Sequence, residues 1–176
     1  MPRLKVINPE TDTGPGADLI NRLPEQKRLN IFKSMANNAG VAKAFMQFSQ
    51  GVKAGALTDA EHEIIALTVA QKSGCDYCLA AHTKMAEAAG INNDLAIQIR
   101  QGTADNDRHQ ALLDFTSAIL KNDGWVSDEQ LEAFREAGYD DDAVVEVIGE
   151  IAVMTFTNLF NHVNHTEIDM PEVAAV

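Results

Sequence analysis

The stretch LTDAEHEIIALTVAQKSGCDYCLAAHTKMAEAAG, residues 57–90, predicts two consecutive α-helices joined by a very short turn. Thr58 and Glu61 have the spacing of a capping box, a pattern that marks the start of a helix, and Gly74 is of the residue type that commonly ends one. Cys75 then falls at or just before the first turn of the second helix. Because so few residues connect the two helices, we expect them to pack against each other as a hairpin.

Outside this hairpin, nearly every segment also has the apolar spacing that indicates a helix, and no segment alternates as a half-buried strand does. Residues 1–16 end in a stretch rich in Pro, Gly, Asn and Asp and are predicted to be an N-terminal loop segment. Residues 17–176 are predicted to form a single all-α domain of about seven to eight helices, with its core motif at 57–90. The other predicted helices lie within residues 25–37, 41–50, 92–102, 107–124, 125–138 and 141–165.

The chain has 176 residues and a net charge of −12, from 26 acidic and 14 basic residues. This balance argues against nucleic acid and against an anionic membrane surface as partners, since both attract basic patches. The longest apolar stretch, residues 143–160, is interrupted by Glu146 and Glu150, so it is not expected to span a membrane. The N-terminus has no apolar run of signal-peptide length, and we expect a cytoplasmic protein, in which a disulfide is more often catalytic or redox-sensing than structural.

The hairpin holds both cysteines of the chain, in the pattern Cys75-x-x-Cys78-x-x-x-His82. On a helix this spacing places the three side chains on one face, with Cys78 and His82 one turn apart. A thiol near a helix N-terminus and an imidazole has a lowered pKa, and its thiolate is the nucleophile that attacks a disulfide or a peroxide oxygen. The second cysteine can then condense with the resulting sulfenic acid and leave a disulfide.

Glu63 lies one helix upstream, in a row of otherwise small or apolar residues. A carboxylate on such an inward stripe needs a partner, and the hairpin allows Glu63 to face His82. A buried Glu beside this ring would orient the base, as a third group does for other activated nucleophiles. Glu61, by contrast, shares its face with polar residues and is expected to be solvated.

Other interpretations of the cysteine pair stay open at this point. Cys75 and Cys78 could be small buried hydrophobes, or could bind zinc together with His82 and a fourth ligand from elsewhere. A c-type haem site is excluded, because it needs a histidine where the chain has Leu79. A thioredoxin fold is disfavoured, because no alternation of strand and helix surrounds the motif.

This part of the chain resembles the core motif of the alkylhydroperoxidase D (AhpD)-like family. The resemblance is carried by Glu63, the eleven residues after it, Cys75-x-x-Cys78-x-x-x-His82 and the closing KMAEAAG. That family is part of the carboxymuconolactone decarboxylase superfamily. The resemblance is strong over the hairpin and weaker over the helices on either side. It implies an AhpD-like all-α fold and a homo-oligomer, either a trimer or a hexamer. The decarboxylase branch of the superfamily lacks the cysteine pair, which argues against lactone decarboxylation.

The resemblance also implies an activity, that of a thiol-dependent alkyl hydroperoxide reductase without cofactor or metal. Cys78 would be the peroxidatic cysteine, Cys75 the resolving cysteine, and Glu63 with His82 the proton relay. From the residues alone, the helix terminus favours Cys75 as the thiolate and His82 favours Cys78. The assignment follows the histidine, since a base must lie within hydrogen-bond reach.

The implied partners are a hydroperoxide substrate and a dithiol reductant, which would be a small molecule or a lipoylated or thioredoxin-like protein. The alternative function is that of a thiol–disulfide redox partner or sensor without significant peroxidase activity, or of a metal-binding domain. Some family members carry a second histidine immediately before the second cysteine, where this chain has Tyr77. We therefore expect this chain to be a less efficient peroxidase than the family members that have this second histidine.

Further residues are assigned from their place in the sequence. Asn158, His162 and His165 share a face of the last helix and are expected to serve the helix end rather than to line an active-site cleft or a subunit interface. We also expect His62 and His109 to lie at the surface, and Phe115 and Trp125 to lie in the core.

Overall fold

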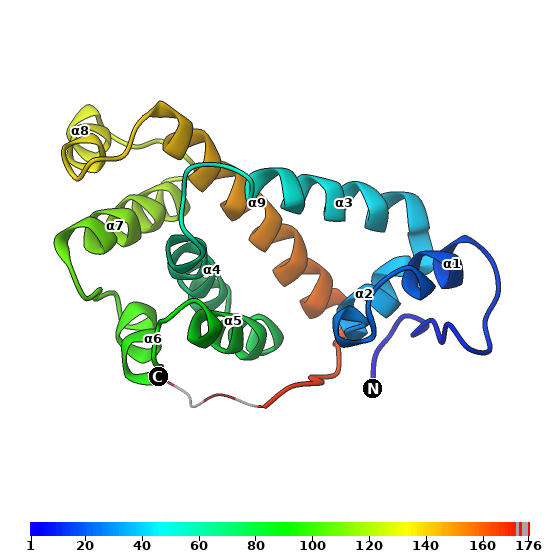
Figure 1. Cartoon of the computed structure of the whole chain (residues 1–176). Helices are drawn as coiled ribbons and strands as arrows, with labels where there is room; N and C mark the ends of the chain where they lie inside the picture. Colours follow the sequence, from blue (N-terminus) through cyan, green and yellow to red (C-terminus); the bar gives the residue numbers. More distant parts are fainter. Residues whose placement is uncertain (172, 174–175) are drawn as a thin grey trace.

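The computed structural model describes all residues of the chain except 172, 174 and 175. The described residues form nine α-helices and two short 3-10 helices and no strand, so the all-α prediction is confirmed (Figure 1). In chain order the elements are α1 (Pro15–Asn21), η1 (Glu25–Lys27), α2 (Asn30–Met35), η2 (Ala36–Asn38), α3 (Ala39–Val52), α4 (Asp59–Ser73), α5 (Asp76–Ala88), α6 (Asn93–Arg100), α7 (Asp107–Lys121), α8 (Asp128–Glu136) and α9 (Asp141–Asn164), where η denotes a 3-10 helix.

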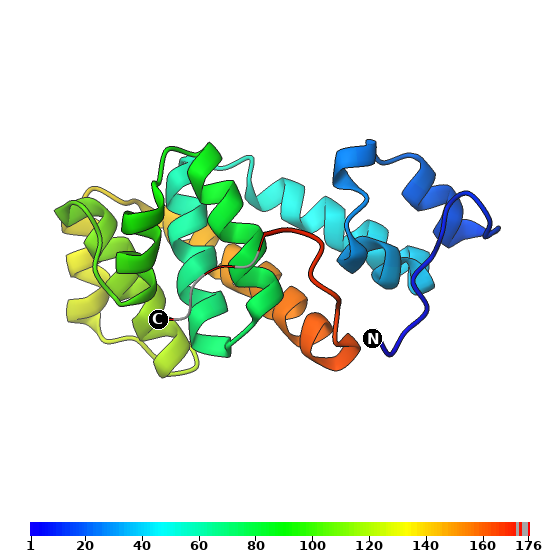
Figure 2. The same ribbon diagram turned by 90° about the horizontal axis from the view of Figure 1, so that it is seen from below.

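Helix α4 is the centre of the domain, in contact with α5, α6, α7 and α9. Because neighbours enclose it on nearly all sides, Ile64, Ile65 and Leu67 have no exposed surface. Helix α5 lies beside α4, and α9 packs against both (Figures 1 and 2). Side chains of α4, α5 and α9 therefore meet in the interior.

The α4–α5 hairpin forms as the sequence predicts. Thr58 and Glu61 make a reciprocal capping box at the start of α4. Gly74 ends this helix in the left-handed conformation, with φ of 67°, which glycine adopts without strain. Cys75 follows directly as the N-cap of α5. The predicted caps Asn92 of α6 and Ser127 of α8 are likewise present.

The N-terminal third differs from the prediction of one helix over residues 25–37. The structure instead has η1, a break at Arg28 and Leu29 with non-helical backbone, α2 and η2. Helix α1 was not predicted, and it overlaps the expected loop segment by two residues. A helix as short as α1 is stable because of its packing contacts rather than because of the helix propensity of its own sequence. A Cβ at Gly16 would collide with the carbonyl of Ala36, so glycine allows α1 to lie directly against η2.

Glu61 is buried, so the prediction that it is solvated is wrong. Its carboxylate accepts hydrogen bonds from Thr58, from Nε of Arg108 at 3.0 Å and from the hydroxyl of Tyr139 at 2.7 Å. The guanidinium of Arg108 also lies over the ring of Tyr139, 3.8 Å from its centre. Neighbours on several sides of α4 enclose its first half, so the consecutive polar residues Glu61, His62 and Glu63 are all buried.

His62 is also buried, which corrects its expected place at the surface. Its Nε2 lies 3.1 Å from a carboxylate oxygen of Glu146, and its Nδ1 lies 3.2 Å from one of Glu150. The Glu146 carboxylate additionally accepts hydrogen bonds from the backbone N–H groups of Ala56 and Leu57. These contacts join the start of α4 to the first half of α9.

Trp125 is 86% exposed, so its expected place in the core is wrong, whereas Phe115 is buried as predicted. The aromatic contacts lie instead between the helices. The ring of Phe134 on α8 stacks between those of Phe115 on α7 and Tyr139 before α9, each 4.3 Å away. Trp125 is not part of this stack.

By length and composition alone, α9 is the one helix in the described part of the chain that passes as a candidate membrane span. It nevertheless packs against α2, α3, α4 and α5 and carries the buried carboxylates of Glu146 and Glu150. These are features of the core helix of a folded domain, as expected from the two interrupting glutamates.

Candidate active site

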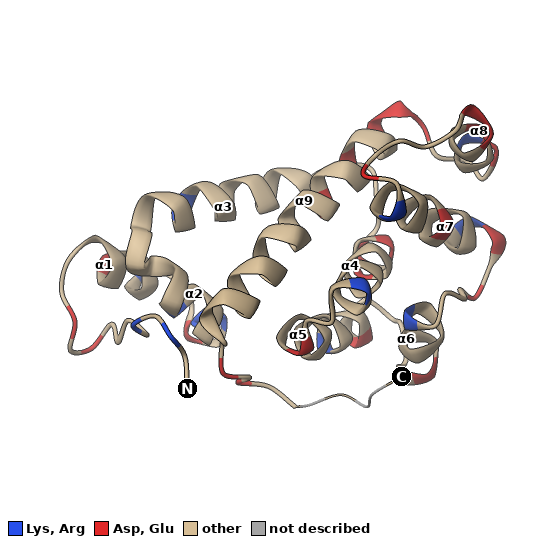
Figure 3. Cartoon of the chain, turned by 180° about the vertical axis from the view of Figure 1, so that it is seen from behind, with Lys and Arg blue, Asp and Glu red and all other residues tan. Residues whose placement is uncertain are grey.

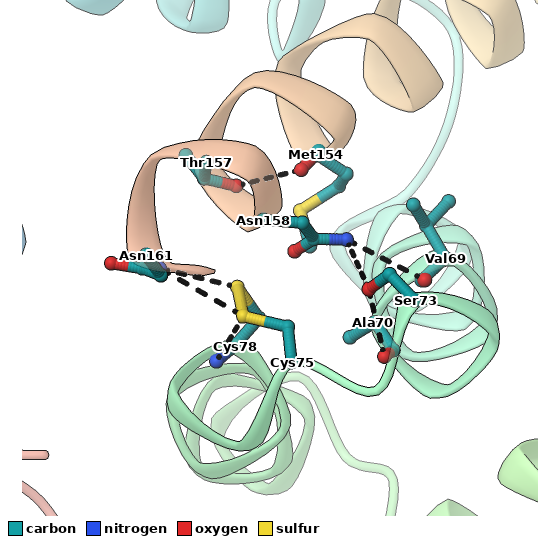
Figure 4. Close-up of a disulfide and its surroundings, with 9 residues drawn as sticks. All are labelled: Val69, Ala70, Ser73, Cys75, Cys78, Met154, Thr157, Asn158 and Asn161. Carbon is teal, nitrogen blue, oxygen red and sulfur yellow. Dashed lines mark hydrogen bonds between the residues drawn. A yellow bond between two sulfur atoms is a disulfide. The ribbon is translucent and has the colours of Figure 1, made fainter. Parts of the chain in front are cut away.

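The two cysteines lie at the start of α5 and are joined in a disulfide (Figure 4). Cys75 is 1% exposed and Cys78 is 2% exposed, so the pair is buried. As the N-cap, Cys75 has extended backbone, and its Sγ accepts the backbone N–H of Cys78 at 3.3 Å. The end of α5 that stabilises negative charge is therefore directed at a sulfur atom.

Glu63 and His82 meet across the α4–α5 hairpin, as the sequence predicts. The Glu63 Oε2 atom lies 2.7 Å from Nδ1 of His82, and Oε1 lies 3.3 Å from Nζ of Lys53. Burial raises the pKa of the Glu63 carboxyl, but the charge and hydrogen bonds of His82 and Lys53 outweigh it and lower the pKa below its usual value. Glu63 is therefore an ionised carboxylate that fixes the imidazole and leaves Nε2 for proton exchange.

Asn161 of α9 is a site residue that the sequence analysis missed. Its Nδ2 lies 3.3 Å from Sγ of Cys78 and 3.9 Å from Sγ of Cys75 (Figure 4). The only available signal was the helical spacing from Asn158, which is buried on the same side of α9 and donates to the hydroxyl of Ser73 at 2.8 Å. That spacing alone does not indicate which helix α9 faces.

His162 and His165 are exposed, unlike Asn158, so the three residues do not share one environment. His165 caps the end of α9 in the left-handed conformation. The structure thus leaves both histidines at the helix end, away from the buried sulfur atoms.

Tyr77 is buried and serves as a structural link at the position where some relatives have histidine. Its hydroxyl donates to Asp169 at 2.8 Å and accepts the backbone N–H of Ile31 at 3.4 Å. The other carboxylate oxygen of Asp169 accepts the backbone N–H of Asn30 at 2.7 Å. Burial and then the neighbouring Asp169 carboxylate raise the pKa of the Tyr77 phenol, which stays protonated. Tyr77 thus ties α5 to α2 and to the C-terminal segment.

No group of three or more His, Cys, Asp or Glu side chains in the described residues is arranged to hold a metal ion. Two open pockets, of about 280 and 350 Å³, lie between α7 and α8 and between α4, α6 and α7. Neither pocket is lined by a cysteine, Glu63 or His82.

Comparison with known proteins finds a similarity in sequence over part of the chain and a similarity in fold over nearly all of it. Residues 39–108 match the family model of the carboxymuconolactone decarboxylase family. The alkylhydroperoxidase AhpD core protein from Ralstonia eutropha, an uncharacterised peroxidase-related protein, superposes with a TM-score of 0.85 at 22% identity, over 96% of this chain and 92% of its own.

Two further solved structures share the fold. A peroxidase-related protein from a Silicibacter species has a TM-score of 0.72 at 21% identity, over 78% of this chain and 75% of its own. A variant of the debrominase Bmp8, bound to 2,3,4-tribromopyrrole, has a TM-score of 0.68 at 21% identity, over 88% of this chain and 82% of its own. No curated protein matches the chain significantly. Residues 39–108 are thus similar to the carboxymuconolactone decarboxylase family, and the chain as a whole has the fold of AhpD-like proteins.

Proposed function

We propose that this protein is a thiol-dependent hydroperoxide reductase in which Cys78 is the peroxidatic and Cys75 the resolving cysteine. The observation that carries the proposal is the placement of an ionised Glu63 2.7 Å from His82, one helical turn after Cys78. A buried redox pair with an oriented base one helical turn further along the same helix has the groups that thiolate chemistry needs. The AhpD-like fold, which is shared with peroxidase-related proteins, supports the same assignment.

The proposed reaction has two steps at sulfur. The Cys78 thiolate attacks the terminal oxygen of ROOH, the O–O bond breaks, and the departing alkoxide takes a proton from His82 to leave as ROH. Cys78 is then a sulfenic acid. The Cys75 sulfur attacks it, the S–O bond breaks, and water leaves as the disulfide forms. Two thiols and ROOH thus become one disulfide, ROH and water, and an external dithiol returns two electrons and two protons.

The roles of the neighbouring groups follow from their contacts. The Glu63 carboxylate holds the imidazole through Nδ1, so that Nε2 is available to take a proton from a thiol and return it to the alkoxide. The N–H group of Cys78 offers a hydrogen bond to Cys75, which stabilises Cys75 as the leaving thiolate during reduction of the disulfide.

Hydroperoxide consumption tests the proposal. With tert-butyl hydroperoxide and dihydrolipoamide, the wild type is expected to turn over, whereas Cys78→Ser is expected to lose the activity. Cys75→Ser is expected to react once and to accumulate a sulfenic acid on Cys78, which dimedone traps and mass spectrometry locates. An unchanged rate in Cys78→Ser would overturn the proposal, and a dimedone adduct on Cys75 in Cys78→Ser would reverse the order of the cysteines.

A redox partner or sensor is the principal alternative, because the same pair can exchange with disulfides without using a peroxide. This alternative predicts rapid reduction of the Cys75–Cys78 disulfide by a dithiol together with no measurable hydroperoxide turnover.

The debrominase of the same fold is the reason to test a second activity, reductive debromination. With 2,3,4-tribromopyrrole and dihydrolipoamide, a reductive debromination would convert a C–Br bond and two thiols into a C–H bond, HBr and a disulfide. Bromide release measures this activity directly.

A further inference from the structure

We propose that Asn161 is a further catalytic residue, which donates its side-chain N–H to the sulfur of Cys78 and stabilises the thiolate. The inference rests on the proposed role of Cys78 as the reactive thiol. It does not depend on which oxidant that thiol attacks. It also places part of the site on α9, far along the chain from the motif of α4 and α5.

The geometry supports a specific interaction with Cys78. The Nδ2 atom is 3.3 Å from Sγ of Cys78 and 3.9 Å from Sγ of Cys75, which makes Cys78 the closer acceptor. Figure 4 shows the amide reaching the sulfur atoms from α9, while the N–H of Cys78 reaches Cys75 from within α5. Each sulfur atom therefore has its own hydrogen-bond donor.

Burial makes the donor at Cys78 important. A thiolate that is removed from water is disfavoured, so burial alone would raise the thiol pKa and keep the sulfur protonated. A hydrogen bond to the charged form opposes this effect, and such bonds are stronger in surroundings of low polarity. Asn161 is 4% exposed, and its N–H therefore acts on the sulfur with little competition from water.

The test measures the pKa of Cys78 alone, in a Cys75→Ser background and without any peroxide. The rate of reaction with iodoacetamide as a function of pH reports the thiolate. Asn161→Ala is expected to raise this pKa by about one unit, and Asn161→Asp by more, because a carboxylate repels the thiolate. At pH values above the new pKa the alkylation rate should recover, which a distorted site would not show.

Asn158→Ala is the matched control, since Asn158 is a buried asparagine one turn earlier on α9 that bonds Ser73 and not a sulfur atom. It is expected to leave the thiol pKa unchanged. An unaltered pKa in Asn161→Ala would overturn the inference. If Asn161→Ala and the nearly isosteric Asn161→Asp both fail to fold, Asn161 belongs to the fold rather than to the thiol chemistry. The peroxidase assay of Cys75→Ser is independent, so either proposal can fail without the other.

Discussion

Glu63 holds a negative charge in surroundings that normally neutralise a carboxylate. Burial raises the pKa of an isolated carboxyl group, and only the partners His82 and Lys53 bring the pKa of Glu63 below its usual value. The charge therefore depends on the same contact that orients the imidazole. Removal of that charge should affect the thiol, because the imidazole that serves as the partner of the thiolate then loses the carboxylate that orients it.

Glu63→Gln tests this coupling at the level of a single group. The amide has the size of the carboxylate but no charge, so we expect a raised pKa of the reactive thiol and a fall in the peroxidase rate of about 10²-fold. Glu87→Gln is the control, since Glu87 is an exposed carboxylate on α5. Iodoacetamide reactivity across pH gives the thiol pKa, and equal values in the wild type and Glu63→Gln would remove Glu63 from the mechanism.

Tyr77 differs from Glu63 in that its contacts are structural. Tyr77→Phe removes the hydrogen bond to Asp169 and leaves that carboxylate with fewer donors, so we expect a loss of stability of about 1–2 kcal/mol. For a chain of this length the melting temperature should fall by about 2–4 °C for each kcal/mol. Thermal unfolding followed by circular dichroism measures it. A normal melting temperature with a reduced peroxidase rate would contradict the structural role and favour a direct one.

The residue-level predictions succeeded where a local pattern determined the outcome. Spacing along two joined helices was enough to predict that Glu63 and His82 meet. It was not enough for Asn161, whose partner lies on a helix more than eighty residues away. His62 and Glu61 were misplaced because their sequence neighbours are polar, whereas their spatial neighbours come from α7, α9 and the turn before α9.

At the scale of elements, α4 organises the domain, and its first turn is anchored by Glu61. Burial alone would raise the pKa of this carboxyl, but hydrogen bonds from Thr58, Tyr139 and Arg108 lower it below the usual value of 4.5. A group with a lowered pKa in the folded state stabilises the fold above its unfolded pKa. That stabilisation is lost as the pH falls through the folded value.

Glu61→Gln should therefore destabilise the protein in a way that depends on pH. At pH 7 we expect a loss of about 2–3 kcal/mol, since the charged acceptor of Arg108 and Tyr139 is removed. The difference from the wild type should begin to shrink as the pH falls below the usual value of 4.5, where the unfolded chain takes up the proton, and should be lost as the pH falls through the lower folded pKa. Urea unfolding at several pH values checks this, with the exposed Glu136→Gln as the control. A constant difference from pH 7 to pH 3 would show that the charge is not responsible.

Helix boundaries were predictable where side chains cap the helix and unpredictable where packing defines it. Thr58, Gly74 and Ser127 act on their own neighbours in the chain, so their effect can be read locally. The break at Arg28 and Leu29 has no such signal, and the short helix α2 after it is held by contacts with α3 and α9. The same limitation explains why α1 was not predicted.

At the scale of the whole molecule, α3 and α9 leave an apolar surface uncovered. On α9, the exposed residues Val145, Ile148, Leu159 and Val163 recur at helical spacing and form one stripe. Val41 and Phe48 on α3 are exposed as well. Figure 3 shows that the visible faces of these two helices carry few charged residues. We call the six residues the α3–α9 stripe.

We expect a second copy of the chain to cover the α3–α9 stripe. Exposed apolar patches of this kind commonly mark protein interfaces. With a net charge of −12, two copies repel each other over most of their surfaces, and an uncharged stripe is where they can approach closely. A homo-oligomer, trimeric or hexameric as the family resemblance implies, would bury the stripe.

Leu159→Asp tests the oligomer, because it places a charge on the stripe without touching the sulfur atoms. The wild type is expected to be an oligomer by size-exclusion chromatography with light scattering, and Leu159→Asp a smaller species or a monomer, since a desolvated charge disfavours association. Trp125→Asp is the matched control, for Trp125 is still more exposed but lies outside the stripe and should leave the assembly unchanged. A monomeric wild type at micromolar concentration would contradict the expectation. If Trp125→Asp dissociates and Leu159→Asp does not, the interface lies at the α7–α8 end of the molecule instead.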